Sequence, residues 1–271
     1  MKGSNQTDHA IYVFFHRQAP LISQGPLYKP IQAGNALLTE ESPYPGDDTG
    51  DHISGKNQYY SELTGIYWVW KNTSHNIVGS CHYRRFFTTH PLPLVYAFKH
   101  WILHPFSRKN SQGLWYSTNY EKHKRMIMTE SEMVSILNEY DAILPVPRKF
   151  RYSIENHYRK YHEMADLGLV RGILADRHPE YLVSFDQTMK SDELYANNMF
   201  VLKNEHFQNF MEWWFDILFR FEEQTQLDNY TGYQQRIFGF MAERLLTVWF
   251  RHHNLKVKEL PLLYFKRLKY S

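Results

Sequence analysis

The stretch IVGSCHYRRFF, residues 77–87, joins an apolar run to a basic, aromatic turn. The apolar run predicts a buried strand, and the arginines that follow predict polar chemistry at its carboxyl end. A second apolar run, IYVFF at residues 11–15, is followed at once by His16 and Arg17. Ligands of open α/β sheets bind just beyond the carboxyl ends of strands. His16 is therefore a candidate wall of a binding site, with a solvated loop residue as the alternative.

Further apolar runs predict an α/β domain. YDAILPV at residues 140–146 and NMFVL at residues 198–202 are typical of short strands. A helix is expected to begin at Ser61, where apolar residues recur with helical spacing. Two more amphipathic helices are expected over residues 207–221 and 237–249. No repeat or linker divides the 271 residues, so we expect a single domain.

Composition and charge exclude several classes of protein. Hydrophobic residues make up 43% of the chain and charged residues 22%, which excludes disordered and fibrous proteins. The net charge of +3 is too small to drive general nucleic-acid binding, so no nucleic-acid partner is expected. Any anion site must therefore be local.

The cysteine usage and the N-terminal residues bear on location. The single cysteine, Cys81, cannot form an internal disulfide, and MKGSNQTDHA at the N-terminus has no apolar signal region. Both features favour a reducing compartment, most simply the cytoplasm. No apolar run reaches the roughly 18 to 20 residues of a membrane-spanning helix.

The densest group of reactive side chains is the cluster His82, Arg84 and Arg85. Arginine is expensive to bury unpaired, so two adjacent arginines after a buried strand favour an anion ligand over a packing role. Because neighbouring residues of a strand point to opposite faces, a turn is needed for both to reach one ligand. The planar guanidinium suits phosphate, and a surface ion-pair cluster is the alternative.

Residues 18–58 hold no clean period and predict a long loop, with three acidic residues at its centre: Asp47, Asp48 and Asp51. These carboxylates suit a cation or sugar hydroxyls, with a solvated turn as the alternative. The register of a calcium loop is missing. The chain also lacks H-E-x-x-H, G-x-S-x-G, P-loop and G-x-G-x-x-G motifs, and its histidines match no zinc spacing.

Seven groups of residues occur in the order of a known family. They are YKPIQAGNAL, GDDTGDHISGKN with YSELTGIYWVWKN, GSCHYRRFF, YDAILP, YSIENHY, NNMFVLKNEHF and YQQRIFGFMAERLL. From Ile11 to Trp249 the chain thus resembles the DUF4422 family of bacterial capsule and O-antigen glycosyltransferases. The resemblance implies a GT-A-like, Rossmann-like mixed sheet flanked by helices. Residues 11–150 would bind the nucleotide-sugar, and the mainly helical residues 151–271 would close over the acceptor.

The implied activity is the transfer of a sugar, galactofuranose or another hexose, from a nucleoside-diphosphate donor. We expect the donor to be linked to UDP. The acceptor would be a glycan or lipid-linked oligosaccharide of a surface polysaccharide. GT-A enzymes usually hold Mg²⁺ or Mn²⁺ with a D-x-D motif, which this chain lacks. We therefore expect no cofactor, with Mg²⁺ or Mn²⁺ as the alternative. A non-catalytic carbohydrate-binding or scaffold protein of the same pathway is the competing interpretation, since the 17% aromatic content suits sugar rings.

Site residues follow from combining these arguments. His82, Arg84 and Arg85 are expected to bind the donor diphosphate. Glu243 is the expected catalytic base, with Asp48 second. The remaining nucleotide- or sugar-binding candidates are His16, Asp47, Asp51, Asn57, Glu62, Asn198 and Arg244. Glu243 and Arg244 match the family's E-R pair, for which a structural salt bridge is the alternative.

Two segments suggest peripheral contact with the inner membrane. After Trp249, basic residues alternate with large apolar ones, a composition that suits an anionic membrane surface. The aromatic patch from Pro91 to Phe106 is longer than the family's usual turn and would add a second anchor. The alternative is an ordinary C-terminal segment whose apolar residues pack on the domain.

Overall fold

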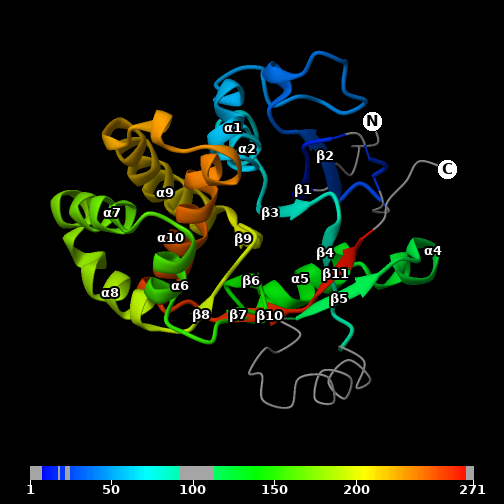
Figure 1. Cartoon of the computed structure of the whole chain (residues 1–271). Helices are drawn as coiled ribbons and strands as arrows, with labels where there is room; N and C mark the ends of the chain where they lie inside the picture. The colour runs from blue at the N-terminus through cyan, green and yellow to red at the C-terminus, as the bar shows by residue number, and fades with distance from the viewer. Residues whose placement is uncertain (1–7, 18, 22–24, 92–112, 267–271) are drawn as a thin grey trace.

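The computed structural model describes residues 8–17, 19–21, 25–91 and 113–266. The strands are β1 (His9–Phe15), β2 (Tyr28–Gln32), β3 (Ile77–His82), β4 (Arg85–Phe87), β5 (Leu114–Ser117), β6 (Ala142–Pro145), β7 (Arg148–Lys149), β8 (Glu193–Leu194), β9 (Phe200–Lys203), β10 (Val257–Leu260) and β11 (Leu262–Phe265). The helices are α1 (Asn57–Tyr60), α2 (Leu63–Asn72), α4 (Tyr120–His123), α5 (Glu130–Glu139), α6 (Ile154–Tyr161), α7 (Met164–Arg177), α8 (Leu182–Lys190), α9 (Asn204–Gln224) and α10 (Ile237–His253). In Figure 1, α6 to α10 gather on one side of the molecule and the strands with α5 on the other.

Within the described residues, nine strands form one mixed sheet in the order β10-β6-β9-β3-β4-β11-β5, with β1 beside β3 and β2 beside β1. Along β1 the side chains alternate between two buried clusters. Tyr12 and Phe14 face the cluster of α9 and α10, whereas Val13 and Phe15 face the cluster that contains Met133 of α5. Both faces of the sheet are thus covered, which explains why β1, β3, β6 and β9 are almost entirely buried along their length.

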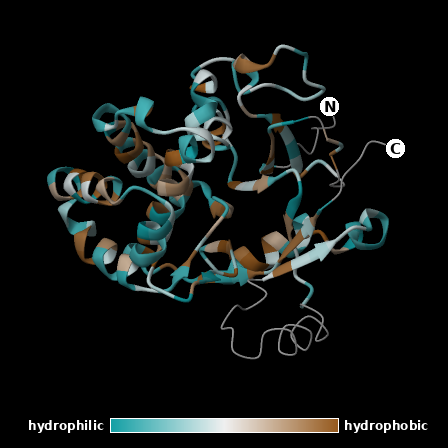
Figure 2. Cartoon of the chain, viewed as in Figure 1, coloured by the Kyte–Doolittle hydropathy of each residue, from teal (hydrophilic) through white to brown (hydrophobic). Residues whose placement is uncertain are grey.

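The helices follow the expected pattern with one informative exception. Every apolar residue expected in the core of α9 is buried. In α10 the same is true except for Phe240, which is half-buried and lines a cavity. Figure 2 shows hydrophobic and hydrophilic residues alternating along these helices, as one buried face requires. The expected start at Ser61 is wrong by two residues, because Ser61 has a φ of 53° and separates α1 from α2.

The region expected to be one long loop contains β2. Among the strands that the structure describes, β2 pairs only with β1, in parallel, so it lies at an edge of the described sheet. Its Pro30 hides it from sequence reasoning, because proline is tolerated only at such edges and bulges.

The C-terminal segment proposed as a membrane contact is part of the sheet. β10 pairs with β6, and β11 lies between β4 and β5. Leu260, Leu262, Leu263 and Phe265 are each at most 4% exposed. The alternative interpretation, packing on the domain, is therefore correct for these residues. The Pro91–Phe106 patch, apart from its first residue, lies outside the described residues, as do residues 267–271.

The strands of the two expected halves interleave. β9, from the second half, lies between β3 and β6 of the first, and β11 lies against β4. The halves are therefore not separate folding units. None of the described helices is long and apolar enough to cross a membrane.

Replacing Leu263 by alanine is expected to lower the free energy of unfolding by about 2 to 4 kcal/mol, because the side chain is fully buried and its loss leaves a cavity. Urea denaturation followed by tryptophan fluorescence measures this. Leu38→Ala, at a position 43% exposed, is the control and is expected to be nearly neutral. Equal stability of the two variants would contradict the burial of β11.

Candidate functional site

The order of the parallel strands places a crevice at the carboxyl ends of β1 and β3. β1 is followed in sequence by β2 on one side and by β3 on the other, so the chain reverses direction across the sheet here. His16 directly follows β1, and His82 ends β3. Ligands of open α/β sheets bind at such a reversal, so the crevice is the expected place for a site.

The turn expected at the two arginines exists. Tyr83 and Arg84 connect β3 to β4, and His82 pairs with Arg85 across the turn. Both guanidinium groups lie over the ring of Tyr264 in β11, with Cζ at 5.3 Å from its centroid for Arg84 and 4.8 Å for Arg85. The C-terminal strand thus supports the basic turn. Neither arginine forms an ion pair with a described carboxylate.

Two cavities open beside this turn and share a wall. The strand cavity, about 470 Å³, is bounded by the end of β1, by Asn57 and by Arg84. The helix cavity, about 410 Å³, is lined by α6, α10 and β7. The shared wall consists of Glu62, His82, Arg85 and Arg236. The two cavities therefore form one cleft that runs from the carboxyl end of β1 to α10.

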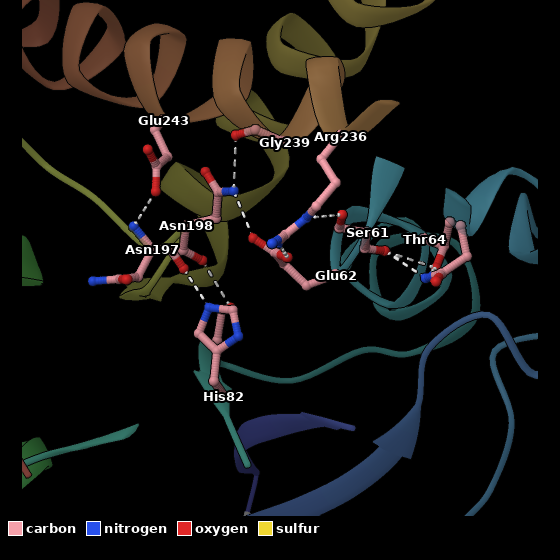
Figure 3. Close-up of polar contacts among 11 residues, drawn as sticks. Ser61, Glu62, Thr64, His82, Asn197, Asn198, Arg236, Gly239 and Glu243 are labelled. Atoms are coloured by element: carbon pink, nitrogen blue, oxygen red, sulfur yellow. Dashed lines mark hydrogen bonds and ion pairs between the residues drawn. The ribbon is translucent and has the colours of Figure 1, made fainter. Parts of the chain in front are cut away.

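The backbone of Asn197 holds both His82 and Glu243 in place (Figure 3). The Asn197 carbonyl accepts a hydrogen bond from Nε2 of His82 at 2.6 Å, and its N–H donates to Oε1 of Glu243 at 2.6 Å. Burial and the charge of Arg85 lower the pKa of His82, against the attraction of Glu62. The imidazole is therefore neutral, with its proton on Nε2 and its Nδ1 free to accept.

Glu62 is held at the junction of the two cavities. Nδ2 of Asn198 donates to Oε1 of Glu62 at 2.8 Å, and Nη2 of Arg236 lies 3.6 Å from Oε2. Burial alone would raise the pKa of Glu62, but the charge of Arg236 and the hydrogen bond from the Asn198 amide act in the opposite direction and lower it. Glu62 is therefore an ionised carboxylate in the middle of the cleft.

Glu243 and Arg244 both line the helix cavity. Arg244 is 2% exposed, donates to the carbonyl of Phe240 at 2.6 Å, and lies 3.9 Å from Oε2 of Glu243. The side chain of Glu243 is 18% exposed. The pair thus reaches the cleft, as the sequence suggested. The salt bridge that was the alternative is also present, but at 3.9 Å it is long.

The family model of DUF4422, a domain of unknown function, matches residues 10–254. The chain belongs to the DUF4422 family. All residues that line the two cavities lie within the matched range.

A solved structure of similar fold is the apo structure of the bifunctional glycosyltransferase WbbM. It matches with a TM-score of 0.84 and 28% sequence identity, over 97% of this chain and 46% of that one. The DUF4422 chain thus spans about half of the WbbM chain and has the mixed α/β fold of a glycosyltransferase. Comparison with curated proteins finds no match.

The acidic loop of this DUF4422 chain does not reach the cleft. Asp47 is fully buried, and its carboxylate accepts hydrogen bonds from the N–H groups of Gly34 and Asn35 and from the Ser54 hydroxyl. Asp48 accepts from the Asn35 amide, and Asp51 from the Tyr67 hydroxyl. These carboxylates shape the loop, and Asp48 lines neither cavity, which removes the geometric support for it as a base.

The other sequence candidates lie in or beside the cleft. His16 and Asn57 line the strand cavity, although the Asn57 amide is already bonded to the Ser61 carbonyl and the Thr64 hydroxyl. Asn198 is 1% exposed and acts through Glu62. Among the parts of the chain that the structure describes, no three His, Cys, Asp or Glu residues gather as a metal site.

Sequence reasoning missed several cleft residues, above all Arg236, Asn197, Arg148 and His157. Asn197 carries a weak signal, because it begins an Asn-Asn pair, and asparagine tolerates left-handed backbone better than most residues. The φ angles of Asn197 and Asn198 are 75° and 48°. No local pattern marks Arg236, whose role depends on α10 lying beside α1.

Acid is expected to destabilise the protein through His157. Burial and then the charge of Arg244 lower its pKa to about 4, so the folded state binds no proton where the unfolded histidine does. The contribution of His157 to the free energy of unfolding is therefore fully present above about pH 6.5, and it is lost as the pH falls toward 4. Between pH 7 and pH 5 we expect a loss of about 1 kcal/mol, allowing for partial exposure.

Urea titrations at the two pH values test this expectation. A His157→Gln variant is expected to lose less stability than the original protein on acidification. His52→Gln, at an exposed position, is the control and keeps the full dependence. An unchanged pH dependence in His157→Gln would show that the histidine titrates normally.

Proposed function

We propose that this DUF4422 protein is a glycosyltransferase that transfers a sugar, such as galactofuranose or another hexose, from a nucleoside-diphosphate donor to a glycan acceptor. The proposal depends on Arg84 and Arg85, which lie at the turn after β3 beside the strand reversal and form no ion pair with a carboxylate of the described residues. The similarity in fold to WbbM supports it. We further propose that the donor is linked to UDP and that the product is a surface polysaccharide. The proposed location of the enzyme is the cytoplasm.

In this proposal the donor occupies the strand cavity. The nucleotide lies beyond the ends of β1 and β3, near His16, and its diphosphate contacts Arg84 and Arg85. Glycosyl transfer builds negative charge on the departing diphosphate, and fixed guanidinium groups stabilise that charge. Burial lowers the pKa of Arg85, yet a guanidinium remains charged at neutral pH.

The acceptor enters from the helix cavity, so its hydroxyl meets the donor at the shared wall. For transfer with inversion, a base must lie within hydrogen-bond reach of that hydroxyl. Glu62 lines both cavities, whereas Glu243 lines only the helix cavity. We therefore assign the base to Glu62 and a role in orienting the acceptor to Glu243.

Activity is expected to survive an excess of EDTA, because the arginines take the place of a metal. Sugar transfer from UDP-linked donors, with and without the chelator, measures this directly, and calorimetric titration of UDP under both conditions measures binding of the nucleotide. GDP and a neutral oligosaccharide serve as comparison ligands. Loss of transfer under EDTA that Mn²⁺ restores would contradict metal independence, and binding of oligosaccharide without any nucleotide would contradict the transferase itself.

A further inference from the structure

The helix cavity is unusually basic for a site that would hold a neutral sugar. Its lining contains the arginines Arg85, Arg148, Arg236 and Arg244 against the carboxylates Glu62 and Glu243. Glu62 pairs with Arg236, and Glu243 lies at the limit of ion-pair distance from Arg244. Arg148 forms no ion pair with a described carboxylate. If Arg85 binds the donor diphosphate, the other arginines of the lining still outnumber its carboxylates, so the cavity keeps a positive charge.

Arg244 is the deepest of these cations, and its hydrogen bonding is incomplete. Its side chain is 2% exposed and stacks on the ring of Tyr158, with Cζ 4.7 Å from the centroid. One nitrogen donates to a main-chain carbonyl, and Nε has no partner among the described residues. Burying a guanidinium without a full set of partners is costly, which favours a negatively charged ligand that completes the set.

The neighbouring His157 does not add to the positive charge and leaves a second polar atom unsatisfied. Its ring stacks on Phe150 at 3.9 Å between centroids, and its Nδ1 is buried with no partner among the described residues. Tyr161, Tyr233 and Phe240 line the same cavity. Flat aromatic faces beside donors are suited to a sugar ring that carries a polar substituent.

The geometry points to a second anion subsite in the helix cavity, in which Arg148 and Arg244 bind a negatively charged group of the acceptor. The group is a carboxylate, as on an acidic sugar, or a phosphate, as on a phosphorylated or lipid-linked sugar. Both present oxygens that match a guanidinium. This inference rests on the proposed function, because it assigns the strand cavity to the donor.

The test uses the full chain saturated with UDP and three probes: methyl glucuronide, glucose 1-phosphate and neutral methyl glucoside. Calorimetry is expected to show at least one charged probe binding about tenfold or more tightly than the neutral one. The charged probe that binds better distinguishes the carboxylate from the phosphate. Equal binding of all three would overturn the subsite.

Arg148→Gln separates this subsite from the donor site. Arg148 is half-buried on the two-residue strand β7, so its replacement is compatible with folding. We expect a loss of about tenfold in affinity for the charged probe, with UDP affinity unchanged. Arg159→Gln, exposed on α6, is the matched control.

Two results would contradict different parts of the argument. If Arg148→Gln weakens UDP as much as the charged probe, the helix cavity holds the donor, and the acceptor subsite is wrong. If the protein binds the charged probe but no nucleotide, the transferase proposal fails while the anion subsite stands.

Discussion

Replacing Arg84 by alanine is expected to reduce kcat by about 100- to 1000-fold, and Arg85→Ala is expected to do the same. Each change removes one charged donor from the place where the leaving diphosphate gains charge, and loss of one such donor has an effect of that size. Neither guanidinium has a described carboxylate partner whose charge would be left behind. Transfer of sugar from a UDP-linked donor, measured under saturating substrate, reports the effect.

Controls separate this role from a structural one. Both arginines lie over Tyr264, so circular dichroism and the urea midpoint must show that each variant folds. Arg84→Lys keeps the charge but loses the planar fork, and it is expected to retain part of the activity. Arg159→Ala, exposed on α6, is expected to keep full turnover. Full turnover in both alanine variants would contradict the assignment of the diphosphate site.

The basic turn was predictable because its evidence is local. An apolar run indicates β3, and the two arginines that follow it indicate an anion site. This prediction does not depend on which strands pair with β3. The need for a turn followed from the alternation of side chains along a strand, and the pairing of His82 with Arg85 supplies that turn. Glu243 and Arg244 were likewise placed near the cleft by their position beside the buried Leu245.

The rest depended on contacts between distant parts of the chain. Residues 257–265 have the same composition whether they lie on a membrane or pair within the sheet, and only the pairing of β10 with β6 and of β11 with β4 and β5 decides between the two. The carboxylate of Asp47 looked free in sequence because two of its partners are backbone N–H groups, which every sequence contains, and the third is the hydroxyl of Ser54, seven residues away. Arg236 joins the cleft through Glu62, far away in sequence.

The Asn197–Asn198 pair shows how such contacts organise the cleft. Both asparagines have a left-handed backbone. The first positions His82 through its carbonyl and Glu243 through its N–H, and the second positions Glu62 through its side-chain amide. A left-handed backbone at consecutive residues other than glycine is strained, and proteins retain it mainly at functional sites. The candidate base, Glu62, is thus held by a hydrogen bond from the side chain of a residue in this turn.

Replacing Glu62 by glutamine is expected to reduce kcat by about 100- to 10,000-fold, because an amide cannot take the proton of the acceptor hydroxyl. Glutamine keeps the shape of the side chain, and its carbonyl oxygen still accepts the hydrogen bond from Asn198. Glu243→Gln is the matched control: it also retains an acceptor for the N–H of Asn197, and it is expected to raise KM more than it lowers kcat.

The pH profile provides the independent check on this assignment. Since the pKa of Glu62 is lowered, the carboxylate is ionised across the neutral range, and kcat/KM should be flat there and fall only as the pH drops below the usual range of a glutamate. Because burial lowers the pKa of His82, that group adds no step near pH 6.5. If Glu243→Gln abolishes turnover while Glu62→Gln preserves it, the base is Glu243, and the acceptor hydroxyl lies deeper in the helix cavity than the shared wall.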